Sequence, residues 1–393
     1  MRSIGKICFA LLTPLVFLQP LAASSSFADD VPAVCQQHSA FDTHPNKAFV
    51  AKAQRGFNLP NWDRKNPKDR PDWRTLIELK HKGFSHIRLP FFHRAFAQGN
   101  LNAQDVQSYL DWMVRDVERL NLIGYAVSLD FHPSREFNNL LNNQPLLGLK
   151  RLREIWSAVA KKVAHLPFDD VAVELLNEPD IADEIWQTAL PRLVQDLRRQ
   201  LPQHTIVISP SGPQRHEVLF SMTPVEDKNT IYAVHYYDPF FFTHQGAEWL
   251  PENEPVRAFQ GLSFPLSTRS PSVVENRKRL ARNNQREALT YLERHVLEPW
   301  DEGGIKDTFK LMGDWSRKMG RVLIVNEFGV LSHHSPYHAR LRWLDEVVQA
   351  LKENCIGWTH WEYSDGFGFV DPSTNKPDTA IMRALLGNTK AKE

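Results

Sequence analysis

The chain contains 393 residues, of which 42% are hydrophobic and 11% aromatic, and this composition excludes an intrinsically disordered protein. Its 47 basic and 46 acidic residues give a formal net charge of +1, so the charge balance gives no support for general nucleic-acid binding. A chain of this length can hold two or three domains, or one large α/β barrel.

The N-terminal segment has the features of a secretory signal peptide. Two basic residues precede an apolar stretch from Ile7 to Leu18, and small residues follow it. We expect cleavage after Ala28, with Ala23 as the alternative, so that residues 1–28 form the signal peptide. An uncleaved anchor is the other interpretation, but the apolar stretch is short for a membrane span. We therefore expect a secreted or periplasmic protein with no membrane span in its mature part.

Two cysteines, Cys35 and Cys355, remain after this cleavage. An oxidising compartment allows a disulfide between them, but the geometry that decides it is not contained in the sequence. A disulfide and two free thiols both stay open. Two cysteines so far apart do not resemble a zinc site.

Short β-branched segments alternate with longer segments of helical periodicity along the chain. The predicted strands are residues 53–58, 86–89, 125–130, 171–176, 206–209, 231–235, 322–326 and 357–361. Apolar residues at spacings of three and four predict helices at 102–120, 186–201 and 341–351. Eight such units predict an α/β fold with a single closed (β/α)8 TIM barrel rather than an open doubly wound sheet. No Gly-x-G-x-x-G motif opens any of the helices, which further disfavours a dinucleotide-binding fold.

One unit of this pattern is enlarged. Residues 239–320 span about 80 positions between the sixth and seventh strands, where a short loop and one helix would suffice. The first part is rich in Phe and Trp, and we interpret it as a long loop over the C-terminal end of the barrel. The second part, 273–297, is predicted to be one charged amphipathic helix. The alternative is that this segment only covers the side of the barrel.

Polar side chains follow or end six of the eight predicted strands. Because the C-terminal ends of barrel strands converge, these groups are expected to form one site. Any single one of them has a structural explanation, such as a rim ion pair or a buried histidine, but packing alone does not explain six. The residues are Arg88, His132, Asn177, Glu178, His235, Tyr237, Glu327 and Trp361.

Glu178 and Glu327 lie at the ends of well-separated strands, and two carboxyl groups facing one cleft are what glycoside hydrolysis requires. One must hold a proton for the leaving oxygen, and the other must be ionised. Their surroundings must therefore separate their pKa values. Arg88 would favour the ionised form of a nearby carboxylate, and Trp361 offers a flat face to a sugar ring.

The sequences around the two acids, Leu176-Asn177-Glu178-Pro179 and Val325-Asn326-Glu327-Phe328-Gly329, resemble the signatures of glycoside hydrolase family 5, the cellulase family. The resemblance implies one catalytic domain over residues 29–393 and a retaining mechanism, with Glu178 as acid/base and Glu327 as nucleophile. It implies that six further residues bind the sugar or support the two acids, namely Arg88, His132, Asn177, His235, Tyr237 and Trp361. Asn58, Trp62 and His93 are added as candidate cleft residues.

The resemblance implies a β-linked polysaccharide as substrate and neither a cofactor nor a metal. Residues 242–249 resemble a loop of some endoglucanases, which favours a β-1,4-glucan or a mixed-linkage β-glucan. Pro133 after His132 departs from the common endoglucanase pattern, so a β-mannan, a β-1,3-glucan or an exopolysaccharide stays open as the alternative substrate. We expect a monomer that binds no nucleic acid.

The sequence disfavours three other functions. A metal-dependent barrel hydrolase could use Asp130, His132, His235 and Glu327, but the sequence contains neither a His-x-His pair on one strand nor a His-Glu-x-x-His helix. A glycan-binding protein without activity is disfavoured by the two intact acid signatures. A serine hydrolase is disfavoured because no Gly-x-Ser-x-Gly motif occurs.

Overall fold

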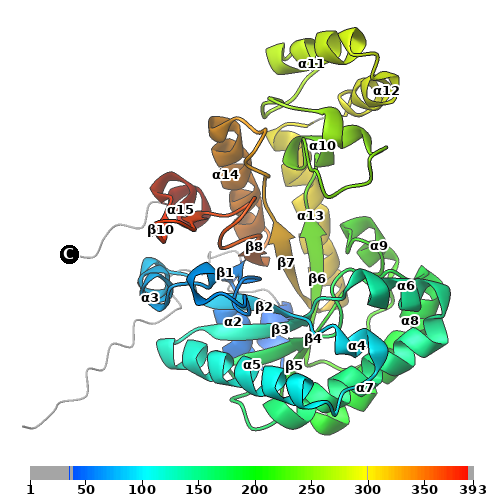
Figure 1. The fold of residues 1–393 in the computed structure, drawn as a ribbon, viewed down its shortest axis with the longest axis vertical. Helices are drawn as coiled ribbons and strands as arrows, with labels where there is room; N and C mark the ends of the chain where they lie inside the picture. Colours follow the sequence, from blue (N-terminus) through cyan, green and yellow to red (C-terminus); the bar gives the residue numbers. More distant parts are fainter. Residues whose placement is uncertain (1–34, 36–38, 299, 388–393) are drawn as a thin grey trace, which may run out of the picture. The chain divides into compact units, whose positions relative to one another are not determined.

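The computed structural model describes residues 35, 39–298 and 300–387, and a closed barrel of eight parallel strands lies at its centre (Figure 1). Arg55, Gly56 and Phe57 of the first strand pair with the eighth strand, which closes the barrel. The predicted (β/α)8 TIM barrel is therefore confirmed. The strands, which follow each other around the barrel in chain order, are β1 (Arg55–Asn58), β2 (His86–Phe91), β3 (Ala126–Phe131), β4 (Val171–Glu174), β5 (Thr205–Ile208), β6 (Thr230–Tyr236), β7 (Val322–Phe328) and β8 (Gly357–His360).

Helices separate the strands along the chain, and β9 (Val370–Asp371) and β10 (Lys376–Pro377) form a small antiparallel sheet after the barrel. None of the helices in the described part of the chain is both long and apolar enough to cross a membrane. The helices are α1 (Ser39–Thr43), α2 (Lys47–Lys52), η3 (Pro67–Asp69), α3 (Trp73–Lys82), α4 (Ala95–Gln98), α5 (Gln104–Ile123), α6 (Arg135–Asn143), α7 (Pro145–Val163), α8 (Asp183–Gln200), α9 (His216–Ser221), α10 (Phe240–Thr243), η4 (Pro255–Ala258), α11 (Pro271–Arg282), α12 (Arg286–His295), α13 (Glu302–Met319), α14 (Tyr337–Glu353) and α15 (Thr379–Leu386).

The apolar periodicity of the sequence predicts the packing of the outer helices correctly. In α5, which corresponds to the predicted helix 102–120, the buried positions include Val106, Leu110, Met113, Val117 and Leu120. These spacings of three and four place the buried side chains on one face of the helix. The left-handed Gly124, with φ of 99°, then ends the helix and turns the chain into β3.

Apolar side chains close the N-terminal end of the barrel. Phe49, Val50 and Ala53, from α2 and the residue after it, pack in one cluster with small and β-branched side chains of the strands. Asn46 fixes the position of α2, because its Oδ1 accepts a hydrogen bond from Phe49 N at 3.0 Å and its Nδ2 donates to Thr205 Oγ1 at 3.1 Å. The polar side chains of the barrel therefore lie above an apolar floor.

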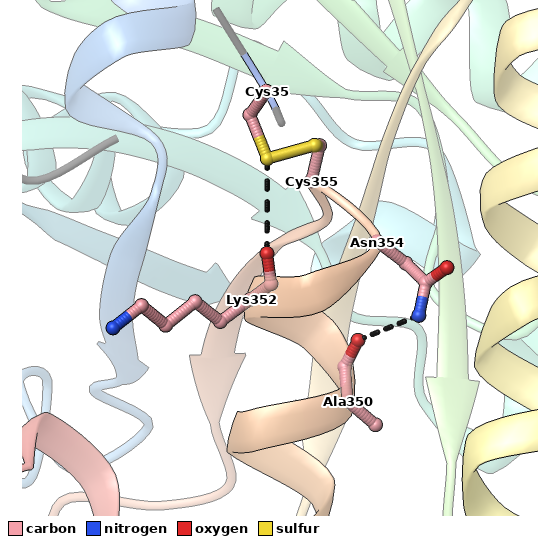
Figure 2. The surroundings of a disulfide bond; sticks show 5 residues. All are labelled: Cys35, Ala350, Lys352, Asn354 and Cys355. Atoms are coloured by element: carbon pink, nitrogen blue, oxygen red, sulfur yellow. Dashed lines mark hydrogen bonds between the residues drawn. A yellow bond between two sulfur atoms is a disulfide. The ribbon is translucent and has the colours of Figure 1, made fainter. Parts of the chain in front are cut away.

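A disulfide joins Cys35 to Cys355, which settles the alternative that the sequence left open. The two Cα atoms lie 5.4 Å apart, and 320 positions separate the two residues in the sequence. Figure 2 shows Cys355 directly after the end of α14, with the Cys35 sulfur 3.7 Å from the carbonyl oxygen of Lys352. The bond ties the chain before α1 to the connection between α14 and β8. The expected signal peptide, residues 1–28, lies outside the described residues.

The enlarged segment between β6 and β7 differs from its prediction in one respect. Residues 273–297 form two helices, α11 and α12, and not one. They are separated at Asn283, Asn284 and Gln285, where Asn284 has a φ of 54°. Asn tolerates this left-handed conformation better than most residues, so the Asn-Asn pair ends the first helix. In Figure 1 the two helices lie away from the barrel strands.

The first part of the enlarged segment lies at the C-terminal end of the barrel. Leu331 N, in the loop after β7, donates a hydrogen bond of 2.8 Å to the carbonyl oxygen of Thr243 in α10. The ring of His244 packs against Tyr237, which follows β6, and against Phe367, which follows β8. This position agrees with the interpretation of residues from 239 onward as a loop over the active end of the barrel.

Candidate active site

Arg88, a fully buried residue of β2, is the centre of a polar network inside the barrel. Its Nε and both terminal nitrogens donate hydrogen bonds, so the guanidinium uses all its faces. Three of the acceptor residues lie on β1, β4 and β7, and a fourth follows β4. An ion pair with a residue of β3 completes the network. The partners of Arg88 are Asn58, Asp130, Glu174, Asn177 and Glu327.

Glu174 and Asp130 supply two buried negative charges beside Arg88. Glu174 accepts from Arg88 Nε at 2.8 Å and from Nη2 at 2.9 Å, and Asp130 Oδ2 lies 3.0 Å from Nη2. Burial and the charge of Asp130 raise the pKa of Glu174, while Arg88 opposes them. Burial lowers the pKa of Arg88, but the surrounding carboxylates outweigh it and raise that pKa well above its ordinary value. The guanidinium is therefore permanently charged.

Glu327, near the end of β7, is nearly buried, with 7% of its side chain exposed. Its Oε1 accepts a hydrogen bond from Arg88 Nη1 at 2.7 Å, and its Oε2 accepts one from the Tyr237 hydroxyl at 3.1 Å. Burial and the charge of Glu327 raise the pKa of Tyr237 well above its ordinary value, so this hydroxyl keeps its proton and donates. Both oxygens of Glu327 are thereby oriented by donors.

Glu178 follows β4 and is more exposed than Glu327, with 40% of its side chain accessible. Its Oε1 accepts a hydrogen bond from His235 Nδ1 at 2.9 Å, and the same nitrogen lies 3.5 Å from Glu327 Oε2. The backbone N–H of Glu178 donates to Gln214 Oε1 at 2.7 Å. His235 therefore lies between the two carboxylates, and a loop after β5 holds the main chain of Glu178.

A shift in strand register places His235 opposite Glu327. The pairing of β6 with β7 is regular up to Val234 and Val325, but beyond that point His235 pairs with Glu327 and not with Asn326. Such a bulge bends a strand locally and re-aims its side chains. It brings both His235 and, two residues on, Tyr237 to the end of β7.

A proton donor is expected to have a raised pKa. The pKa of Glu178 in the unliganded site is not raised. Removal from bulk water raises this pKa, but the hydrogen bond and the charge of His235 outweigh it and hold the pKa below its ordinary value. The neighbouring His132 has a raised pKa, because its hydrogen bond to Asp130 at 3.0 Å outweighs the effect of burial. The unliganded site therefore favours an ionised Glu178 and a protonated His132.

One carboxylate oxygen of Glu178, one of Glu327 and a ring nitrogen of His235 all lie within 4.8 Å of one another. A carboxyl separation of about 5–5.5 Å is typical of retaining glycosidases, and about 6.5–9.5 Å of inverting ones. The spacing would also admit a metal ion, but both oxygens of Glu327 already accept hydrogen bonds from Arg88 and Tyr237. The donor set that the sequence suggested for a metal is not assembled, because Asp130 is turned towards Arg88 and His132.

Aromatic side chains line one side of this polar group. The ring of Trp361, directly after β8, stacks on His132 with centroids 5.7 Å apart and an angle of 18° between the planes. Trp249 of the enlarged segment is 57% exposed, and its ring lies 6.0 Å from that of Phe367. Exposed indole faces of this kind suit the C–H surface of a sugar, since one side is apolar and the edge is polar.

The structure buries two of the predicted cleft residues and packs the third between aromatic rings. Asn58 is fully buried, and its Oδ1 accepts from Arg88 Nη1 at 2.9 Å, so it orients Arg88 and does not face a substrate. Trp62 is 3% exposed and donates its indole N–H to Pro90 O at 2.7 Å. His93 packs between Phe96 and Tyr109. The burial of Asn58 and Trp62 and the packing of His93 give no support to the prediction that these residues contact the substrate.

Sequence reasoning did not assign Glu174, Gln214 or Glu362 to the site. Glu174 lies two residues after Ala172, which packs inside the barrel, so the alternation of side chains along β4 was an available signal for it. Glu362 follows Trp361, and burial together with Asp365 raises its pKa to about 8. Gln214 lies in a loop, and no local pattern marks it.

A family model described as cellulase (glycosyl hydrolase family 5) matches residues 45–366. Endoglucanase 3 of Fibrobacter succinogenes is 26% identical over 335 residues, which cover 81% of this chain and 50% of that protein. This chain therefore spans half the length of that relative. Endoglucanase C of Acetivibrio thermocellus is 25% identical over 326 residues, which cover 81% of this chain and 90% of the relative.

Solved structures share the fold. Endoglucanase Cel5A of Thermotoga maritima aligns with a TM-score of 0.69 at 23% identity, over 87% of this chain and all of that chain. The cellulose synthase subunit Z of Clostridioides difficile aligns with a TM-score of 0.66 at 20% identity, over 84% and 99% of the two chains. At these identities the likeness establishes the barrel and its connections.

Proposed function

The chain belongs to glycoside hydrolase family 5, and we propose that it hydrolyses a β-1,4-linked glucan by a retaining double displacement. As a member of this family the protein is a glycoside hydrolase. The observation that carries the mechanism is the separation of the two acids, whose nearest oxygens lie within 4.8 Å. Such proximity is closer to the separation of about 5–5.5 Å in retaining enzymes than to that of about 6.5–9.5 Å in inverting ones.

In the first step, an oxygen of Glu327 attacks the anomeric carbon while Glu178 gives a proton to the departing glycosidic oxygen. Arg88 and Tyr237 orient the Glu327 carboxylate for this attack, since each donates a hydrogen bond to one of its oxygens. In the second step, Glu178 takes a proton from water, and the resulting hydroxide equivalent breaks the glycosyl–Glu327 bond. The anomeric configuration is retained, and both acids return to their starting forms.

Glu178 must be protonated for the first step. In the unliganded site its carboxylate accepts the hydrogen bond of 2.9 Å from His235, which holds the pKa of Glu178 below its ordinary value. A bound sugar displaces water and removes the solvation of the Glu178 carboxylate, which favours its protonated form. The carboxyl group then takes its proton from solvent, since 40% of the Glu178 side chain is exposed.

The substrate class rests on the printed names of the relatives and on the aromatic surface of the site. The relatives are named as endoglucanases, and two indole rings lie near the site: Trp361, which stacks on His132, and Trp249, which is 57% exposed. Export is supported by the disulfide between Cys35 and Cys355, because such bonds persist in oxidising compartments. We propose a secreted or periplasmic enzyme that acts as a monomer.

The test is the release of reducing ends from soluble polysaccharides by the protein, with EDTA present. The panel contains carboxymethylcellulose, mixed-linkage β-glucan, β-1,3-glucan and β-mannan, and Glu327→Gln serves as the blank. Release from a β-1,4-linked glucan above the blank is the expected result. Release only from mannan or β-1,3-glucan would contradict the proposal of a β-1,4-glucan as substrate. Loss of activity on chelation would contradict a metal-independent mechanism.

A further inference from the structure

Gln214 is a fully buried residue of the loop between β5 and α9, and the mechanism described so far does not use it. Its side-chain oxygen accepts the hydrogen bond of 2.7 Å from the backbone N–H of Glu178. Its own main chain has a φ of 52°, in the left-handed region that is unfavourable for a residue with a Cβ atom. A left-handed glutamine persists only where its surroundings hold it.

The same loop holds the Glu178 turn at a second point and reaches His235 as well. Gly212 N donates a hydrogen bond of 2.8 Å to the carbonyl oxygen of Pro179, the residue after Glu178. The carbonyl oxygen of Gln214 accepts a hydrogen bond of 2.9 Å from His235 N. Gln214 is therefore joined directly to both members of the Glu178–His235 pair.

The turn needs such support because Glu178 itself has a φ of 42°. Its N–H points into the protein, and a buried donor without an acceptor is unfavourable. The amide nitrogen of Gln214, by contrast, is buried and has no hydrogen-bond partner within the described residues. Leaving this nitrogen unpaired is also unfavourable. The interaction that favours a glutamine here is therefore the hydrogen bond accepted by its side-chain oxygen.

We propose that Gln214 is a positioning residue for the proton donor: it fixes the main chain of Glu178 and of His235 so that the two side chains meet the glycosidic oxygen. This proposal rests on the role of Glu178 as acid/base in the proposed function. Displacement of the Glu178 carboxyl would slow proton transfer to the leaving group, whereas attack by Glu327 would be unaffected. The dependence of rate on the leaving group is therefore the specific signature.

The test compares Gln214→Met, which has no acceptor oxygen, with Gln214→Glu, which keeps one at the same reach. For Gln214→Met we expect kcat/KM on cello-oligosaccharides to fall by about 10- to 100-fold, with a much smaller loss on an aryl cellobioside with an activated leaving group. In Gln214→Glu, the ratio of kcat/KM on the cello-oligosaccharide to kcat/KM on the aryl cellobioside should be close to that of the unmodified protein. Its added carboxyl group raises the pKa of Glu178, so the alkaline limb of its pH profile should move to higher pH.

The control is Asn46→Leu, because Asn46 is also buried and its oxygen also accepts a backbone N–H, but it lies at the N-terminal end of the barrel. This variant should lower the unfolding midpoint without changing the ratio of the kcat/KM values on the two substrates. Equal losses of Gln214→Met on both substrates, or the same loss in Gln214→Glu, would overturn the proposal. If Gln214→Met does not fold, Gln214→Asn, whose oxygen is withdrawn by one methylene, gives the same readout.

The failure of this proposal differs from the failure of the proposed function. If Glu178→Ala shows no difference between activated and unactivated leaving groups, Glu178 is not the acid/base and the proposed function fails. If Glu178→Ala shows the difference and Gln214→Met does not, only the positioning role of Gln214 is wrong.

Discussion

The Nη1 atom of Arg88 lies 2.7 Å from Oε1 of Glu327, and the guanidinium is fully buried. The same guanidinium pairs with Asp130 and Glu174, which are also fully buried. One cation therefore compensates three carboxylates beneath the exposed part of the site. Arg88 both fixes the proposed nucleophile and makes the polar interior of the barrel stable.

Replacement of Arg88 by Met should destabilise the fold strongly. Removing one partner from a buried charge network costs about 3–5 kcal/mol, because the remaining charges are left uncompensated. Urea unfolding followed by tryptophan fluorescence measures the change. The matched control is Arg64→Met, since Arg64 pairs with Asp365 at 3.0 Å on the surface and such pairs contribute about 0–1 kcal/mol. Similar losses in the two variants would contradict the central role of the buried network.

Glu178→Ala should separate substrates by their leaving groups. Loss of a general acid costs about 10²–10⁴ in rate when the leaving oxygen needs a proton. An aryl cellobioside with an activated phenol needs little protonation, so its bond cleavage should be almost unaffected. The values of kcat/KM on cello-oligosaccharides and on such aryl glycosides provide the comparison, because kcat/KM reports the first step and not the second, in which Glu178 acts as the base. A uniform loss on both kinds of substrate would mean that Glu178 has another role.

Buried neutral histidines should make the protein lose stability in acid. Burial lowers the pKa of His86 and of His360 to about 3, and that of His44 to about 4. Unfolded histidine has a pKa of about 6.5, so below that pH the unfolded chain binds more protons than the folded one. The free energy of unfolding is therefore unaffected by these groups above about pH 6.5 and falls as the pH drops towards their folded pKa values.

The variant His86→Gln tests this relationship, because glutamine can keep the hydrogen bond to Ser128 but does not titrate. Between about pH 6.5 and pH 5, a single such histidine accounts for about 2 kcal/mol of the loss in stability. We expect the stability of the variant to fall less steeply over this range. A slope equal to that of the unmodified protein would contradict a neutral, buried His86.

The disulfide between Cys35 and Cys355 should stabilise the fold. A cross-link that restricts the unfolded chain typically contributes about 2–4 kcal/mol. Replacing both cysteines by Ser should lower the unfolding midpoint by a corresponding amount. The same midpoint for the oxidised protein, the reduced protein and the double variant would show that the bond does not contribute.

The local patterns of the sequence predict the barrel well, because a short predicted segment corresponds to each of the eight strands and apolar spacing marks three of the outer helices, α5, α8 and α14. The structure also brings together the eight residues that the family resemblance singles out. What the sequence did not reveal depends on contacts between distant segments. The disulfide, the use of Asn58 as a support for Arg88 and the hydrogen bond from Glu178 to Gln214 each join residues that are far apart in the chain.

The division of the predicted helix 273–297 into α11 and α12 has a different origin. Residues 282–287 are all polar, so the apolar spacing has a gap at the break, and the left-handed Asn284 lies in this gap. The prediction of one helix passed over this gap. The missed role of Glu174 is an error of interpretation, since its inward position follows from the alternation along β4.

The most direct test of the central claim is to trap the covalent intermediate on Glu327. Incubation with a 2-deoxy-2-fluoro-β-cellobiosyl fluoride should add one glycosyl group, detected by intact mass, and peptide mapping should place it on Glu327. The activity should disappear in parallel with the labelling. A label on Glu178 or on another residue would contradict the assignment, and so would hydrolysis of a β-1,4-glucan that yields the α-anomer first and leaves no trapped adduct.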